Sequence, residues 1–207
     1  TPKETLKENM STLEEGRADL VALYFMMDQK LVDMGLMESL DVGKAAYDGY
    51  IRNGLLTQLR RLEVGKDVEE AHMRNRQWVS KWVFEKGQAD NVIEEVKRDG
   101  KTYYNITDYD KLRGLFGDLL REVQRIKSQG DTEAGVALVS GYGVKVDRAI
   151  HEEVLARTEK LDIAPYGGFI NPILTMNGDA VSVSYPDNFV EQMLGYSKDY
   201  NFLPDEN

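Results

Sequence analysis

Between residues 108 and 130 the apolar residues recur every three or four positions, and this pattern constrains the fold more than any other. The stripe consists of Leu112, Leu115, Phe116, Leu119, Leu120, Val123 and Ile126. Such spacing places all of them on one face of an α-helix, and that face has to be buried against other elements. Asp108 is suited to cap this helix and Gly130 to end it. The pattern therefore predicts a long helix over about 109–128 within a helical core.

Helical spacing also covers most of the remaining chain. Ser11 or Thr12 is predicted to cap a helix that runs to about Lys30, because a glutamate follows each of them three residues later, as in a capping box. A short apolar segment follows over 31–37. Further helices are predicted over about 42–62, 68–86, 132–142, 147–160 and 187–196. The expected fold class is therefore mainly α.

Two stretches have the features of β-hairpins. Residues 92–98 and 101–106 contain many β-prone side chains, and Asp99-Gly100 between them favours a type I′ turn. Residues 173–176 and 181–184 flank Asn177-Gly178 in the same manner. The chain has no internal repeat and no low-complexity linker. We therefore predict a single helical domain over residues 1–207 with two small β-hairpins.

Composition limits the kinds of partner. The 207 residues include no cysteine, so neither a disulfide nor a thiolate zinc site can form. A formal net charge of −10 disfavours nucleic acids and anionic membranes. No apolar run approaches the ~18 residues of a membrane span, and no signal peptide is recognised. We expect a cytoplasmic protein with a peptide partner, no nucleic acid and no membrane, and a signal peptide ahead of Thr1 stays an open alternative.

The two histidines differ in their surroundings. His151 begins the run His-Glu-Glu-Val-Leu, where a zincin helix would need a second histidine in place of Leu155, so we expect an exposed helix residue. His72 and Arg76 are four residues apart and project from one helix face. On spacing alone, His72 is interpreted as a structural residue.

Three carboxylates lie close together along one predicted helix. Glu15 and Asp19 are four residues apart, and Glu14 precedes them. In one interpretation Glu15 closes a capping box, Glu14 favours the positive helix end and Asp19 is solvated or paired with Arg17. In the other, one carboxylate binds a metal ion and the others orient its remaining ligands. Spacing does not decide between these interpretations.

The segment 14–19, Glu-Glu-Gly-Arg-Ala-Asp, resembles the second signature, E-E-C-R-A-E, of the dipeptidyl peptidase III family of zinc metallopeptidases. Four further segments resemble blocks of that family in the same order. They are Arg-Asn-Gly-Leu-Leu at 52–56, Glu-Ala-His-Met-Arg-Asn-Arg at 70–76, Lys-Ser-Gln-Gly-Asp at 127–131 and Gly-Tyr at 141–142. The resemblance runs from about residue 11 to about residue 196.

This resemblance implies a zinc-dependent exopeptidase that removes dipeptides from peptide N-termini. It implies that Glu15 binds zinc, and that Glu14 and Asp19 orient the zinc-binding histidines. His72 matches a histidine that supports the substrate carbonyl or the developing oxyanion. Two arginines and a lysine match family residues that bind or position the substrate: Arg52, Arg76 and Lys160.

The chain departs from the family pattern in two ways. Gly16 stands where the family has cysteine and Asp19 where it has glutamate, as in bacterial members. The motif H-E-x-x-G-H, which in the family supplies two zinc ligands and the water-activating glutamate, is absent from the 207 residues. Because the chain also begins at Thr1 without an initiator methionine, we expect the C-terminal part of a longer peptidase. Alone, it is expected to be inactive and to bind zinc weakly or not at all.

Two alternatives stay open. In the first, the chain is a non-catalytic helical module that binds peptides or proteins on a peptidase scaffold. In the second, it is an unrelated acidic helical protein in which the matching segments are coincidental. A complete reading frame distinguishes them, because an upstream H-E-x-x-G-H motif supports the enzyme.

Overall fold

A computed structural model describes residues 1–161 and 168–202. It is mainly α-helical with two small antiparallel hairpins, which confirms the predicted fold class. The chain divides into two compact units, residues 1–163 and 164–207, and each is described by itself. The single domain stays a prediction. Within the described residues, no helix has the length and apolarity needed to cross a membrane.

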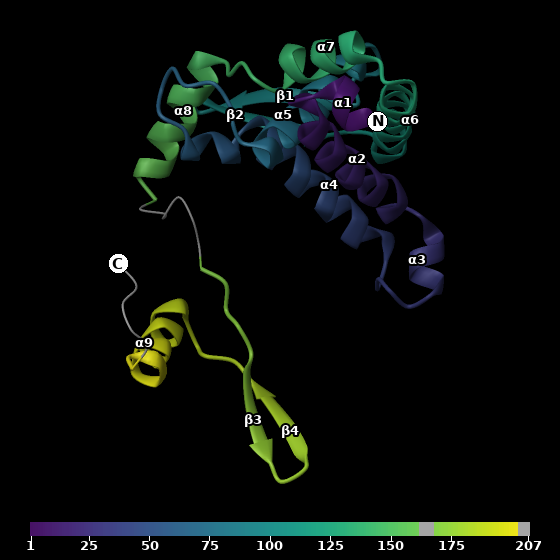
Figure 1. Cartoon of the computed structure of the whole chain (residues 1–207). Helices are drawn as coiled ribbons and strands as arrows, with labels where there is room; N and C mark the ends of the chain where they lie inside the picture. The colour runs from purple at the N-terminus through teal and green to yellow at the C-terminus, as the bar shows by residue number, and fades with distance from the viewer. Residues whose placement is uncertain (162–167, 203–207) are drawn as a thin grey trace. The chain divides into compact units, whose positions relative to one another are not determined.

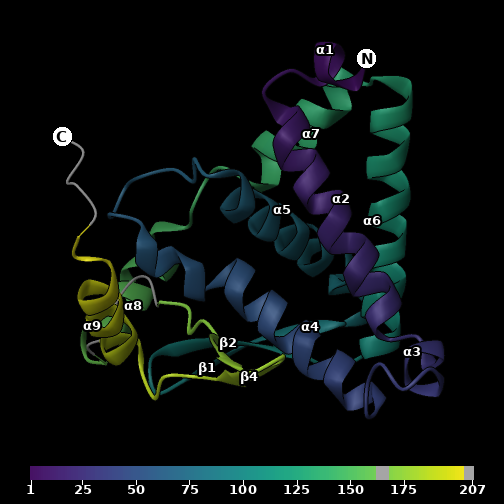
Figure 2. The same ribbon diagram turned by 60° about the horizontal axis from the view of Figure 1, so that its bottom comes forward.

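The first unit holds most of the helices (Figure 1). Its elements are, in order, α1 (Pro2–Leu6), α2 (Asn9–Met26), α3 (Gln29–Asp33), α4 (Leu40–Leu55), the 3₁₀ helix η1 (Thr57–Arg61), α5 (Ala71–Lys86), the 3₁₀ helix η2 (Gln88–Asp90), β1 (Ile93–Arg98), β2 (Lys101–Ile106), α6 (Tyr109–Gln129), α7 (Thr132–Tyr142) and α8 (Arg148–Glu159). In both ribbon views α2 lies between α6 on one side and α4 with α5 on the other (Figures 1 and 2).

The core of this unit lies between α2, α4, α5 and α6. Trp78, Tyr47 and Phe116 are its largest fully buried side chains. The rings of Tyr47 and Phe116 meet edge to face with centroids 5.0 Å apart, and the Tyr47 hydroxyl donates to the carbonyl of Leu23 at 2.7 Å. A buried hydroxyl with a partner avoids the cost of an unpaired polar group, so Tyr47 joins α4 to both α2 and α6.

The long predicted helix is confirmed as α6. Asp108 caps it by accepting from the backbone N–H of Lys111 at 2.9 Å, and Gly130 ends it in the left-handed conformation with φ 64°. The apolar stripe faces the core, because Leu112, Phe116, Leu119, Val123 and Ile126 are all buried. The first hairpin is confirmed as well, with β1 paired to β2 through Asp99 and Gly100 at positive φ, as a type I′ turn requires.

The predicted cap of α2 is wrong. The helix begins at Asn9, so Ser11 and Thr12 lie inside it, and Thr12 is buried. Packing of Asn9 and Thr12 against the core extends the helix by almost a turn, which overrides their local preference for a cap. Glu15 is therefore in the second turn of α2 and closes no capping box.

His151 is the second correction. It is 1% exposed instead of lying on the surface, and its Nε2 lies 3.0 Å from the backbone oxygens of Leu59 and Leu62. Carbonyl oxygens only accept, so Nε2 carries the proton. The ring thereby joins α8 to the end of η1. The helix predicted over 42–62 is likewise two elements, because α4 ends at Leu55 before η1 begins.

The second unit contains β3 (Ile173–Asn177), β4 (Ala180–Ser184) and α9 (Phe189–Tyr200). The predicted hairpin is present, although Asn177 pairs with Ala180 and the turn therefore falls one residue later, at Gly178-Asp179. The predicted last helix is present as α9, which Asn188 caps by accepting from the backbone N–H of Glu191 at 2.9 Å.

Candidate active site on α2, α4 and α5

Close packing of α2 on α5 brings the acidic segment to the start of α5. A β-carbon at Gly16 would lie 2.0 Å from Cζ2 of Trp78, so only glycine allows the helices this approach. Glu70 caps α5 by accepting from the backbone N–H groups of His72 and Met73. The first turn of α5 therefore stands beside the second and third turns of α2.

Glu15 and His72 meet at this junction, although 57 residues separate them in the sequence. Nδ1 of His72 lies 3.4 Å from Oε2 of Glu15, and the two side chains are 56% and 38% exposed. In the part of the chain that the structure describes, the Glu15 carboxylate has no other ion pair or hydrogen bond. A partly exposed carboxylate beside an imidazole is open to a further partner.

Glu14 has a different environment. Arg17 donates to both of its carboxylate oxygens, and Lys127 of α6 forms a second ion pair with it. The Lys127 side chain is only 12% exposed, and burial lowers the pKa of its ammonium group. Two cations thus hold Glu14, and Arg17 is paired with Glu14 instead of with Asp19.

Asp19 is bound by neutral donors from two other helices. Its Oδ2 accepts from the Tyr50 hydroxyl of α4 at 3.1 Å and from Nδ2 of Asn75 of α5 at 3.2 Å. Burial, followed by the negative charge of Asp19, raises the pKa of the Tyr50 hydroxyl well above its usual value. The positive charge of Arg76 opposes that rise, so Arg76 belongs to the same neighbourhood. Of the sequence-predicted residues, the structure thus gathers Glu14, Glu15, Asp19, His72 and Arg76 at this junction.

The donors at this junction fit one side of a zinc site. Zinc accepts carboxylate oxygen and imidazole nitrogen, and a tetrahedral site needs about four ligands in total. Over residues 1–161 and 168–202, no three histidine, aspartate or glutamate side chains come together as a complete metal site. Glu15 is suited by its chemistry to supply one ligand of such a site, and the described residues bring no complete set of ligands around it.

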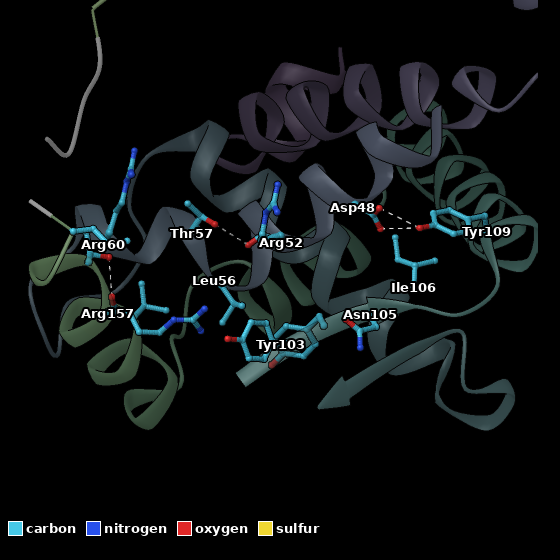
Figure 3. A pocket seen from close by; sticks show the side chains of 14 residues that line it. Asp48, Arg52, Leu56, Thr57, Arg60, Tyr103, Asn105, Ile106, Tyr109 and Arg157 are labelled. Atoms are coloured by element: carbon cyan, nitrogen blue, oxygen red, sulfur yellow. Dashed lines mark hydrogen bonds between the residues drawn. The ribbon is translucent and has the colours of Figure 1, made fainter. Parts of the chain in front are cut away.

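Arg52 and Lys160 line two adjoining cavities of the first unit. Arg52 borders a cavity of about 600 Å³ between α4, η1, β2 and α8, and Lys160 borders one of about 430 Å³. Figure 3 shows Arg157 directed toward Tyr103, and its guanidinium carbon lies 5.1 Å from the ring centroid. Arg52 extends from α4 above Leu56 and Tyr103 in this view. Among the described residues, neither Arg52 nor Lys160 bonds to the carboxylates or to His72.

Sequence reasoning missed Tyr50, Asn75 and Lys127. Tyr50 has helical spacing with the apolar residues Tyr47, Ile51 and Leu55, and in such a pattern its hydroxyl carries no signal. Asn75 is three residues after His72 and shares its helix face, and Lys127 lies in a segment that resembles a family block, so both had detectable signals.

Comparison with known proteins finds related sequences over most of the chain. A model of peptidase family M49 matches residues 1–194. Dipeptidyl peptidase 3 of Mus musculus and that of Rattus norvegicus are each 28% identical to the chain over 172 residues, and the Homo sapiens protein is 27% identical. Each match covers 75% of this chain and 23% of the relative, so the chain spans about a quarter of the length of these curated relatives. The chain belongs to peptidase family M49.

Proposed function

We propose that this chain is part of a zinc-dependent exopeptidase that releases dipeptides from the N-termini of peptides. M49 is a family of metallopeptidases, and the curated relatives carry the name dipeptidyl peptidase 3. The observation that carries the proposal is the contact of Glu15 with His72, 3.4 Å apart at a partly exposed junction. It joins the residue proposed to bind metal with the residue proposed to bind the reacting carbonyl.

Each residue of the junction has a role in this proposal. Glu15 binds zinc through its carboxylate, and Glu14 and Asp19 orient the remaining ligands. When bound, zinc supplies a Lewis acid for the scissile carbonyl and a more acidic water. His72 presents a ring N–H to the carbonyl oxygen as negative charge develops on it, because its half-exposed side chain can reach a bound peptide.

The three basic residues Arg52, Arg76 and Lys160 are proposed to bind the peptide. Cationic side chains are suited to peptide carbonyls and to the C-terminal carboxylate. Arg76 lies at the junction, whereas the other two line cavities beside α4 and α8.

The 207-residue chain by itself is proposed to be inactive, because its sequence has no H-E-x-x-G-H motif. The same absence favours the alternative of a non-catalytic helical module that binds peptides or proteins. The natural reading frame around this sequence separates the two, because only an enzyme needs that motif upstream.

The test uses the natural-length protein and dipeptidyl-arylamide substrates. Release of intact dipeptides that stops with a chelator and returns with zinc supports the proposal. His72→Gln should lower kcat about 10²–10³-fold with a smaller change in KM, since a donor to the oxyanion acts mainly in the transition state. Activity that persists in the presence of the chelator, or products other than dipeptides, would overturn the proposal.

A further inference from the structure

Asp19 is held at one oxygen by donors from two helices. We propose that Tyr50 and Asn75 are positioning residues that fix Asp19, so that Oδ1 of Asp19 receives the ring N–H of a metal-binding histidine. This inference rests on the proposed function and adds to it two residues, which act through Asp19 and not on the substrate.

The orientation of the Asn75 amide follows from its partner. A carboxylate only accepts hydrogen bonds, so the Asn75 atom 3.2 Å from Asp19 Oδ2 has to be the NH₂ group. Oδ1 of Asn75 is then necessarily its other terminal atom. Because Tyr50 also donates to Oδ2 of Asp19, both known donors use the same carboxylate oxygen.

Asn75 leaves one buried acceptor without a partner. The residue is 1% exposed, and among the described residues no donor reaches its Oδ1. Native structures rarely leave a buried polar atom unpaired, because its lost hydration is not replaced. Because solvent does not reach this oxygen, a donor from outside the described residues has no approach to it, and Asn75 acts on Asp19 through its NH₂ group alone.

The two donors also compensate for a short side chain. Asp19 is one methylene shorter than the glutamate of the family signature, so its carboxylate reaches less far from α2. Tyr50 approaches from α4 and Asn75 from α5, and bonds from two directions prevent rotation of the carboxylate. The raised pKa of Tyr50 keeps its hydroxyl protonated, and hence a donor, across the neutral range.

A histidine ring is the donor that fits this position. Histidines that bind a metal through one nitrogen almost always donate the other N–H to a carboxylate or carbonyl. Asp19 follows Glu15 by one helix turn, so the two side chains are neighbours about 5–6 Å apart at their β-carbons. A histidine that shares a metal ion with Glu15 therefore has its second nitrogen within reach of Asp19.

The test measures zinc affinity in the natural-length protein by competition with a chromogenic chelator. Tyr50→Phe and Asn75→Ala should each weaken zinc binding about tenfold, and the double variant up to about a hundredfold, as is usual for partners of metal ligands. Tyr109→Phe is the matched control, because it removes a tyrosine hydroxyl that donates to a different aspartate, Asp48 of α4. It should change the affinity less than twofold.

Substitution of Co²⁺ for zinc gives a second measurement, which would not change if the role of Tyr50 were purely structural. Tyr50→Phe should shift the visible absorption of bound Co²⁺ because the ligand geometry changes, while Tyr109→Phe should leave the spectrum unchanged. If Asn75→Ala does not fold by circular dichroism, Tyr50→Phe alone decides the question. A wild type that binds no zinc would contradict the proposed function itself. A zinc-binding wild type whose Tyr50→Phe variant keeps the same affinity and cobalt spectrum overturns only this inference.

Discussion

Gly16 of α2 lies against the indole of Trp78 of α5 so closely that a β-carbon at position 16 would be 2.0 Å from Cζ2 of the ring. Trp78 is fully buried, so the ring has no open space into which it can move. The glycine in the acidic signature and the tryptophan of α5 therefore form one packing unit, and the cysteine of the family signature does not fit beside this ring.

Gly16→Ala should destabilise the chain. Overpacking a filled core costs about 1–3 kcal/mol in the free energy of unfolding, measured by urea denaturation. Gly49→Ala is the matched control, because position 49 is also helical and a β-carbon there meets nothing within 4 Å. Alanine should stabilise that helix by about 0.5–1 kcal/mol. Equal stability of the two variants would show that α2 and α5 are not packed through Gly16.

His151→Leu should destabilise the chain by removing the donor to the carbonyls of Leu59 and Leu62. Leaving buried acceptors unpaired costs about 1–3 kcal/mol. His72→Leu should alter the free energy of unfolding by less than about 0.5 kcal/mol, because the His72 side chain is half-exposed. Urea denaturation of both variants checks this expectation. A larger loss of stability at His72 than at His151 would reverse the roles given to the two residues.

Acid should weaken the junction of α6 and α7. The backbone N–H of Ala134 and then the guanidinium of Arg125 lower the pKa of Asp131, and Arg125 also lowers the pKa of Glu122. A carboxyl group whose pKa is lowered by folding stabilises the fold above its unfolded pKa, about 4, and this contribution is lost as pH falls through the folded value. The free energy of unfolding should therefore fall from pH 5 to pH 3.

Asp131→Asn tests this origin of the acid sensitivity. Asparagine keeps an N-cap acceptor for α7 but has no charge to lose. Unfolding curves at pH 7, 5, 4 and 3 should show lower stability at pH 7 and a flatter dependence on pH than the wild type. Parallel pH profiles for the two proteins would assign the acid sensitivity to other groups.

Local signals explain which parts of the fold were predictable. The ends of α6 follow from Asp108 and Gly130, and the first hairpin follows from Asp99-Gly100, because caps and turns act within a few residues. The start of α2 was misplaced because Thr12 is buried by the tertiary fold. His151 was misjudged because its acceptors lie 89 and 92 residues away, where no spacing rule reaches.

The candidate site was predictable only in part, for the same reason. Glu15 and His72 are 57 residues apart, so spacing within one helix could not join them, and only the family resemblance assigned both to one site. Tyr50 and Asn75 depend on the crossing of α2 with α4 and α5. That crossing requires the glycine at position 16, whose packing partner is visible only in three dimensions.

The amount of zinc bound by the natural-length protein decides whether Glu15 is a metal ligand. Metal content should be determined by mass spectrometry after gel filtration for the wild type, Glu15→Gln and the control Glu8→Gln, which alters an exposed glutamate at the start of α2. We expect about one zinc per chain in the wild type and in Glu8→Gln, and less than roughly a tenth of that in Glu15→Gln. A Glu15→Gln protein that retains zinc as the wild type does would contradict the assignment of Glu15 as a metal ligand.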